Sequence, residues 1–130
     1  MKAAICSGLM ALTITTANAA ENNTNRANFI LPYCKLTAIE VMDKAENALV
    51  HGRCVGIIQG IELAVRVSYA FAAQAEPSLP RFCADIPTGI TLEQLTDVVI
   101  RYGDTHPEQT HLLFPGFVVF ALRDAWPCKK

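Results

Sequence analysis

The sequence predicts an all-α fold, a small disulfide-stapled bundle of about four helices. In four segments apolar residues recur every three or four positions, the spacing that places them on one side of a helix. No segment alternates apolar and polar residues as a half-buried strand would. With 130 residues, of which 52% are hydrophobic and 18% charged, the chain fits one domain and is too apolar to be disordered.

The first 19 residues have the features of a secretory signal peptide. Met1-Lys2 is a short positive start, residues 3–13 are mostly small and apolar, and Ala17-Asn18-Ala19 is a small-residue cleavage site. A buried first helix is the alternative. We expect cleavage after Ala19, which leaves an exported mature chain of 111 residues.

Cleavage also removes Cys6 and leaves an even number of cysteines. The remaining four, Cys34, Cys54, Cys83 and Cys128, are interpreted as two disulfides. Three pairings are possible, and we favour Cys34–Cys54 with Cys83–Cys128. A metal site is the rival interpretation, but the chain has no C-x-x-C pair and its three histidines have unrelated spacings. We therefore expect no bound metal and no cofactor.

The mature chain is expected to begin with a flexible lead-in over residues 20–31, which are polar and Asn-rich. The helical domain would then cover residues 32–130. Its first helix is expected over residues 32–50, and His51-Gly52 should end or bend it. The buried stripe of this helix is predicted to be Leu36, Ile39, Met42, Ala45 and Leu49.

The second helix is expected from Arg53 to about Gln74, the most apolar stretch of the mature chain. A helix that is apolar on most sides is usually the central one of a bundle. Gly56, Gly60 and Ala64 stand four residues apart and form a small-residue face that another helix could approach closely.

A loop of about a dozen residues follows, with prolines at 77, 80 and 87, and loops of this length are often functional. Residues 91–94 form a capping box that opens a third helix, which Gly103 and then Pro107 limit. Residues 105–108 repeat the capping-box pattern and should start a short turn. The last helix is expected from Pro115, which suits a first helical position, to Trp126.

The chain carries no recognisable catalytic motif, and we expect a protein that binds and is not an enzyme. It has no G-x-S-x-G elbow, P-loop or dinucleotide fingerprint, and its mature cysteines are better explained as disulfides than as nucleophiles. A formal net charge of −1 gives no basic footprint for nucleic acid. No apolar run reaches the length of a membrane span, so we expect no membrane insertion of the mature protein.

Four segments, taken in order, resemble the Rap/Tai family of immunity proteins. Residues 54–60 (CVGIIQG) resemble the family's C-x-G-[YF]-I-x-G helix start, and residues 83–95 resemble its Cys, Ile-Pro, Gly-Val-Thr and Gln-Leu connection. Residues 98–108 resemble its V-V-x-x-Y…H-P-E segment, and residues 121–128 (ALRDAWPC) its closing A-L-x-x-A-[FW]-P-C. The sequence departs from the pattern at Ile57, at Gly103 and at Phe114-Pro115-Gly116.

The resemblance implies a periplasmic inhibitor of a peptidoglycan amidase toxin delivered by the type VI secretion system. Such a protein would occlude the toxin's active site and protect the producing cell and its siblings, and a homodimer is possible. The loop over residues 77–88 is our first candidate for the contact, although it can equally be a plain connection. The candidate toxin-binding residues in and beside it are Glu76, Pro77, Ser78, Arg81 and Asp85.

A small periplasmic helical chaperone or binding protein is the alternative. Proteins of that class share the compartment and the fold class, but they are expected to loosen at low pH and to show apolar surface. An immunity protein should instead stay rigid, because rigidity limits the ordering cost of binding.

Overall fold

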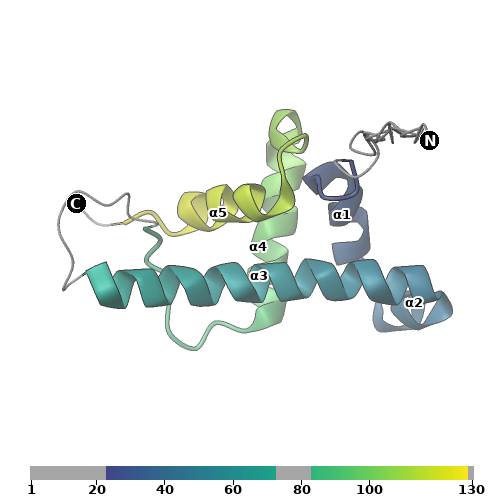
Figure 1. The fold of residues 1–130 in the computed structure, drawn as a ribbon, viewed down its shortest axis with the longest axis horizontal. Coiled ribbons are helices and arrows are strands. Elements are labelled where there is room, and N and C mark those ends of the chain that lie inside the picture. Colours follow the sequence, from purple (N-terminus) through teal and green to yellow (C-terminus); the bar gives the residue numbers. More distant parts are fainter. Residues whose placement is uncertain (1–22, 73–82, 129–130) are drawn as a thin grey trace, which may run out of the picture.

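The computed structural model describes residues 23–72 and 83–128, and the expected signal peptide lies outside them (Figure 1). The described residues form five α-helices and one short 3-10 helix, with no strand longer than an isolated bridge. The elements are α1 (Ala27–Cys34), α2 (Ala38–Asp43), α3 (Ala45–Ala72), α4 (Leu92–Thr105), η1 (Pro107–Gln109) and α5 (Phe114–Ala125). The predicted all-α class is confirmed.

The long helix α3 is the element around which the others are arranged. Helices α1, α2, α4 and α5 all pack against it, and α4 also packs against α1 and α5. Figure 1 shows α4 crossing α3 while α5 runs along it. The core lies where these helices meet, and its largest fully buried side chains are Ile30, Ile58, Val99, Phe114, Phe117, Val118 and Leu122.

Both predicted disulfides are present with the favoured pairing. Cys34 is bonded to Cys54 and Cys83 to Cys128, each with 5.7 Å between the Cα atoms. The first bond joins the end of α1 to α3, and both of its cysteines are buried. The second joins the segment before α4 to the chain after α5.

The expectation of a flexible lead-in is wrong for residues 27–31, which form most of α1. Ala27, Ile30 and Leu31 are buried in the core. The helix is held from outside: the amide of Ala27 donates to the Leu112 carbonyl at 2.9 Å, and that of Asn28 to the Thr110 carbonyl at 2.8 Å. Eight residues are too few for a stable isolated helix, so tertiary contacts make this one.

The single helix predicted over residues 32–50 is also wrong, because three helices share that range. A Thr37–Glu40 capping box starts α2, and it follows the same rule that identified the box at residues 91–94. The predicted buried stripe is largely exposed: Ile39, Met42 and Leu49 are 83%, 88% and 68% exposed. His51-Gly52 does not end or bend a helix here, since α3 continues through it.

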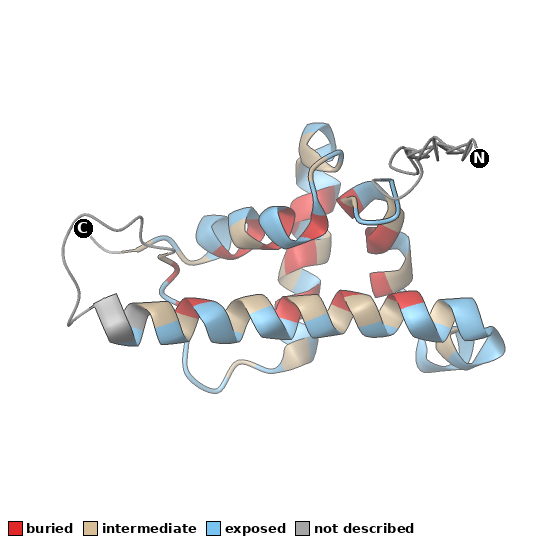
Figure 2. Ribbon diagram, viewed as in Figure 1, coloured by how far each residue is buried: buried red, intermediate tan, exposed pale blue. Residues whose placement is uncertain are grey.

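One side of α3 is buried and the other is open. Figure 2 shows its buried residues on the side facing the other helices, and they include Val50, Cys54, Ile58 and Val65. Gly52, Gly56 and Gly60 lie on the open side, where a Cβ added to any of them would meet no atom within 4 Å, so no described helix uses the small-residue face. By length and composition alone, the Ala45–Ser68 part of α3 would suit a membrane span. A single helix of this kind is weak evidence for membrane insertion, because a helix in the core of a soluble protein can have the same length and composition.

Helices α4 and α5 begin where the sequence predicts. The Thr91–Gln94 capping box is formed, and Pro115 lies in the first turn of α5. Gly103 does not limit α4, which continues to Thr105. The box predicted at residues 105–108 is not formed: Thr105 is the last residue of α4, and its hydroxyl bonds to the Arg101 carbonyl at 3.0 Å while Pro107 opens η1.

Candidate functional site: the connection into α4

The described part of the candidate loop is a connection, residues 83–91, that leads into α4. Figure 1 shows it starting beside the C-terminal end of α5 and passing α3 before it enters α4. Ala84 and Ile86 are buried in the core, whereas Asp85, Pro87, Thr88 and Gly89 are exposed. Gly89 has a φ of +82°, a left-handed conformation that glycine adopts without a steric cost. The connection is thus packed on one side and accessible on the other.

The start of the connection is fixed to the C-terminal segment. The Cys83–Cys128 disulfide joins the two, and the amide of Asp85 donates to the Trp126 carbonyl at 2.9 Å. These bonds hold the segment in place although it has no regular secondary structure. Asp85 is the one predicted toxin-binding residue that lies in the described part of the chain, and it is exposed. Glu76, Pro77, Ser78 and Arg81 lie outside the described residues.

Arg66 of α3 holds the middle of the connection. Its guanidinium donates to the Pro87 carbonyl at 2.8 Å and to the Ile86 carbonyl at 3.4 Å, and it forms an ion pair with Glu62 one turn earlier. Five fixed donors suit a guanidinium to bridge two carbonyls and a carboxylate at once. This contact satisfies backbone carbonyls that have no partner in a helix, and it ties the connection to the central helix.

A hollow of about 390 Å³ opens beside the connection. Residues 87–90 form one wall, α4 contributes Asp97 and Arg101, and Trp126 closes it from the chain after α5. Tryptophan and arginine are among the residues most enriched at the positions that dominate binding energy in protein interfaces. In the sequence, Trp126 stands out only as a helix end and as part of the closing A-L-x-x-A-[FW]-P-C segment, and neither Arg66 nor Arg101 stands out. The available signals were that segment and the single tryptophan of the chain.

The described residues carry no arrangement suited to catalysis. No three histidine, cysteine or carboxylate side chains among them lie close enough to hold a metal, and the four cysteines at 34, 54, 83 and 128 are in disulfides. The Nδ1 atoms of His51, His106 and His111 each lie 2.7–3.2 Å from a backbone carbonyl. A carbonyl only accepts, so Nδ1 donates in His51 and His111, and these two histidines brace the backbone. Nδ1 of His106 also lies 2.9 Å from the Thr105 hydroxyl.

Comparison with known proteins identifies the family. The family model described as Rap1a immunity proteins matches residues 26–128. The chain belongs to the Rap1a immunity protein family. The match covers the whole described helical domain, including α1 and both disulfides, and it confirms the resemblance found in the sequence. No curated protein and no solved structure matches the chain significantly.

Membership of the Rap1a family implies a toxin as the binding partner. An immunity protein acts by binding a toxin, so an accessible, anchored segment is a candidate for the contact.

The departure from the family pattern at Gly103 also has a structural reason here. Gly103 is buried, and a Cβ on it would lie 2.7 Å from Cδ1 of Leu31 in α1, so a larger residue would have to displace the Leu31 side chain.

Proposed function

We propose that this Rap1a family member is a periplasmic immunity protein that inhibits a type VI secretion peptidoglycan amidase by occluding its active site. The family match supports the immunity role. The observation that carries the choice of surface is the anchoring of the connection by Cys83–Cys128 at its start and by Arg66 in its middle. A segment held in one conformation loses little entropy on binding, so more of the contact energy appears as affinity.

In this proposal the segment over residues 77–88 enters the toxin's cleft, and the hollow beside it receives part of the cleft's rim. Glu76, Pro77, Ser78, Arg81 and Asp85 remain the proposed contact residues, and Trp126 and Arg101 extend the surface. The protein needs no chemistry of its own, because denying substrate access is enough to inhibit the toxin.

The periplasmic location follows from the proposed target and from the expected signal peptide at residues 1–19. Two disulfides fit an oxidising compartment outside the cytoplasm. A toxin that cuts the cell wall works in that same compartment, so its inhibitor has to be there as well.

We further propose that the open side of α3 pairs with a second copy of the chain. Each glycine inside a helix lowers the stability of the helix by about 1 kcal/mol relative to alanine. A Cβ at Gly52, Gly56 or Gly60 would contact no described residue, so packing within the chain does not explain these glycines. Leu63 and Val67, 59% and 45% exposed, continue the same side. Gly56→Leu should convert a dimer to a monomer in light scattering, whereas Gly56→Ala should keep the dimer.

The chaperone alternative is favoured by one observation, the exposure of Ile39 and Met42 on α2. A chaperone of that type should loosen as a whole at low pH and should prevent unrelated proteins from aggregating. An immunity protein should do neither.

The deciding experiment is co-purification of the disulfide-bonded mature chain, residues 20–130, with the product of the neighbouring gene. A stable complex with a cell-wall hydrolase whose activity is lost supports the proposal. The variant Asp85→Arg/Arg101→Glu should release the hydrolase, while Arg123→Glu, an exposed change on α5, should not. If the wild-type chain leaves the hydrolase free and active, the proposed inhibition is wrong.

A further inference from the structure

A second surface, outside the connection, has the shape and chemistry of a docking site. A groove of about 730 Å³ lies between α2 and α4, and the end of α1 and the first half of α3 form its base. Helix α2 packs mainly against α3 and has no buried residue, so the space between α2 and α4 stays open. The capping box at Thr37 fixes the start of α2, and Asn47 donates to the Glu40 carbonyl at 2.8 Å, so this short helix is held in place.

The groove is mainly apolar. Val55 of α3 and Leu92 and Ile100 of α4 line it, each partly buried. Met42 forms its outer edge and is 88% exposed, and Ile39, three residues earlier on α2, is 83% exposed. Large apolar side chains held this far out of the core on a fixed helix are a feature of binding surfaces.

The charges at the groove are unbalanced and acidic. Its single lysine, Lys35, is already paired with Asp104 at 2.7 Å. Glu93 and Asp97 line the groove one helical turn apart, and neither carboxylate is in an ion pair with a described residue. Arg101, one turn further on, donates to the backbone oxygen of Asp97 and not to its carboxylate. Like charges four residues apart repel each other, a cost that a partner's cation would remove.

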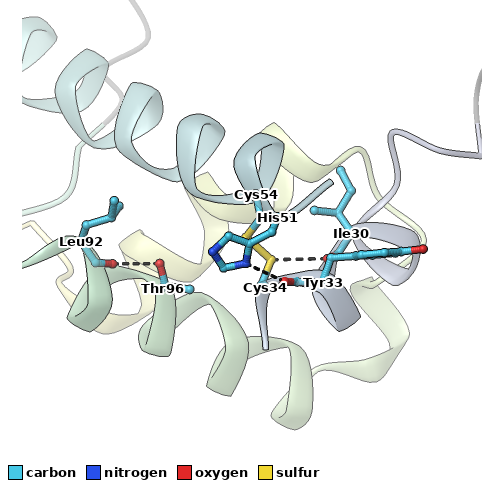
Figure 3. Close-up of a disulfide and its surroundings, with 7 residues drawn as sticks. All are labelled: Ile30, Tyr33, Cys34, His51, Cys54, Leu92 and Thr96. Atoms are coloured by element: carbon cyan, nitrogen blue, oxygen red, sulfur yellow. Dashed lines mark hydrogen bonds between the residues drawn. A yellow bond between two sulfur atoms is a disulfide. The ribbon is translucent and has the colours of Figure 1, made fainter. Parts of the chain in front are cut away.

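His51 gives the groove one oriented acceptor. Figure 3 shows its ring beside the Cys34–Cys54 disulfide, with Leu92 and Thr96 of α4 on the other side. Its Nδ1 donates to the Tyr33 carbonyl at 2.8 Å, so in the neutral ring Nε2 accepts. The Thr96 hydroxyl donates a hydrogen bond to the Leu92 carbonyl at 2.8 Å, so its hydrogen is already used. The polar atoms of the groove therefore favour a partner that donates hydrogen bonds and carries positive charge.

We propose that this groove binds an apolar segment of the toxin that carries a lysine or arginine. The apolar side chains lie over Val55 and Ile100, the cation lies between Glu93 and Asp97, and Val41 and Met42 cover the segment from α2. This inference rests on the proposed function and adds a second contact, which shares Asp97 with the hollow beside the connection. Charge complementarity makes such a contact specific and raises the rate of association.

The first test uses the hydrolase identified by co-purification. Glu93→Gln/Asp97→Asn should weaken binding roughly tenfold and reduce its dependence on salt. The control, Glu108→Gln/Asp124→Asn, removes the same charge from exposed positions elsewhere and should change the affinity less than about twofold. Equal effects of the two double variants, or no effect of the first, would overturn the proposal. Thermal melts of all variants show whether the fold is kept.

The second test addresses the apolar part. Met42→Ser should weaken the complex roughly tenfold without lowering the melting temperature, because this side chain lines the groove and is exposed already. Leu113→Ser, which changes a 54% exposed leucine before α5, is the control and should leave the affinity unchanged. Unchanged affinity in Met42→Ser contradicts the proposed groove.

A third measurement separates the groove from the proposed function. The probes are two amphipathic peptides of about 15 residues, long enough for a four-turn helix, one of leucine and lysine and one of leucine and glutamate. The lysine peptide alone should shift the methyl resonances of Val55 and Ile100, and Glu93→Gln/Asp97→Asn should abolish the shifts. If wild type fails to bind the hydrolase but gives this result, the proposed function is wrong and the groove stands. If neither peptide binds, or both bind equally, the groove proposal fails.

Discussion

Replacing Gly103 by alanine tests the close packing of α1 on α4. The new Cβ would lie 2.7 Å from Cδ1 of Leu31 and 3.5 Å from Cζ of Phe117. Because carbon atoms prefer about 3.5–4.0 Å, the Leu31 methyl must move by about 1 Å inside a packed core. Such overpacking costs about 1–3 kcal/mol. Alanine also stabilises a helix by about 1 kcal/mol relative to glycine. The free energy of unfolding should therefore fall by about 1 kcal/mol in total.

The assay is urea or thermal unfolding of the mature, disulfide-bonded chain. A loss of about 1 kcal/mol lowers the melting temperature by about 4 °C for a domain of this size. The decisive variant is Gly103→Ala in a Leu31→Ala background, where the obstructing methyl is gone. There the same change should stabilise the protein by about 1 kcal/mol, which gives a coupling energy of about 2 kcal/mol between the two positions.

Gly56→Ala is the matched control, because Gly56 also lies inside a helix but has no atom within 4 Å of its Cβ position. It should stabilise the protein by about 1 kcal/mol in either background. If Gly103→Ala behaves like Gly56→Ala in the presence of Leu31, the packing argument is refuted.

The remaining predictions concern pH and the anchors of the connection. Hydrogen bonds from Thr37 lower the pKa of Glu40 below its ordinary value of 4.5, so this contribution to stability is present above that pH and is lost as pH falls through the lowered pKa. The protection of α2 amides against exchange, corrected for the slower intrinsic exchange at low pH, should therefore fall at low pH. At the start of α4, where the box uses the uncharged Gln94, protection should not fall. Replacing Cys83 and Cys128 by serine should lower the free energy of unfolding by about 4 kcal/mol for the 45-residue separation, as measured in urea. Arg66→Met should leave the helices folded by circular dichroism but weaken hydrolase binding by at least about tenfold, because the Ile86 and Pro87 carbonyls lose their donor.

Three outcomes would contradict these predictions. An equal loss of amide protection in α2 and α4 would show that Glu40 does not control the response. A serine double variant as stable as wild type would show that the Cys83–Cys128 disulfide does not stabilise the fold. Unchanged hydrolase affinity in Arg66→Met would show that the connection needs no clamp from α3.

The candidate site was only partly predictable. The cysteine count and the prolines directed attention to the segment before α4, since both are local features of the sequence. Trp126, Arg66 and Arg101 were missed because they come from other helices or from the chain after α5, and only the fold brings them to the connection. The groove beside α2 was hidden for a related reason, since Ile39 and Met42 have the spacing of buried residues but face solvent.

The sequence by itself determined what depends on neighbours along the chain. The all-α class, the capping box at residues 91–94, the proline in the first turn of α5 and the four cysteines that follow the expected cleavage site all follow from residue type and short spacings. The tertiary structure alone decided which apolar stripes are covered, that Ala27–Cys34 folds as a helix, and that Gly103 packs closely against Leu31. The physical reason is that periodicity places side chains on a common face of a helix, whereas burial of that face depends on which distant segment packs against it.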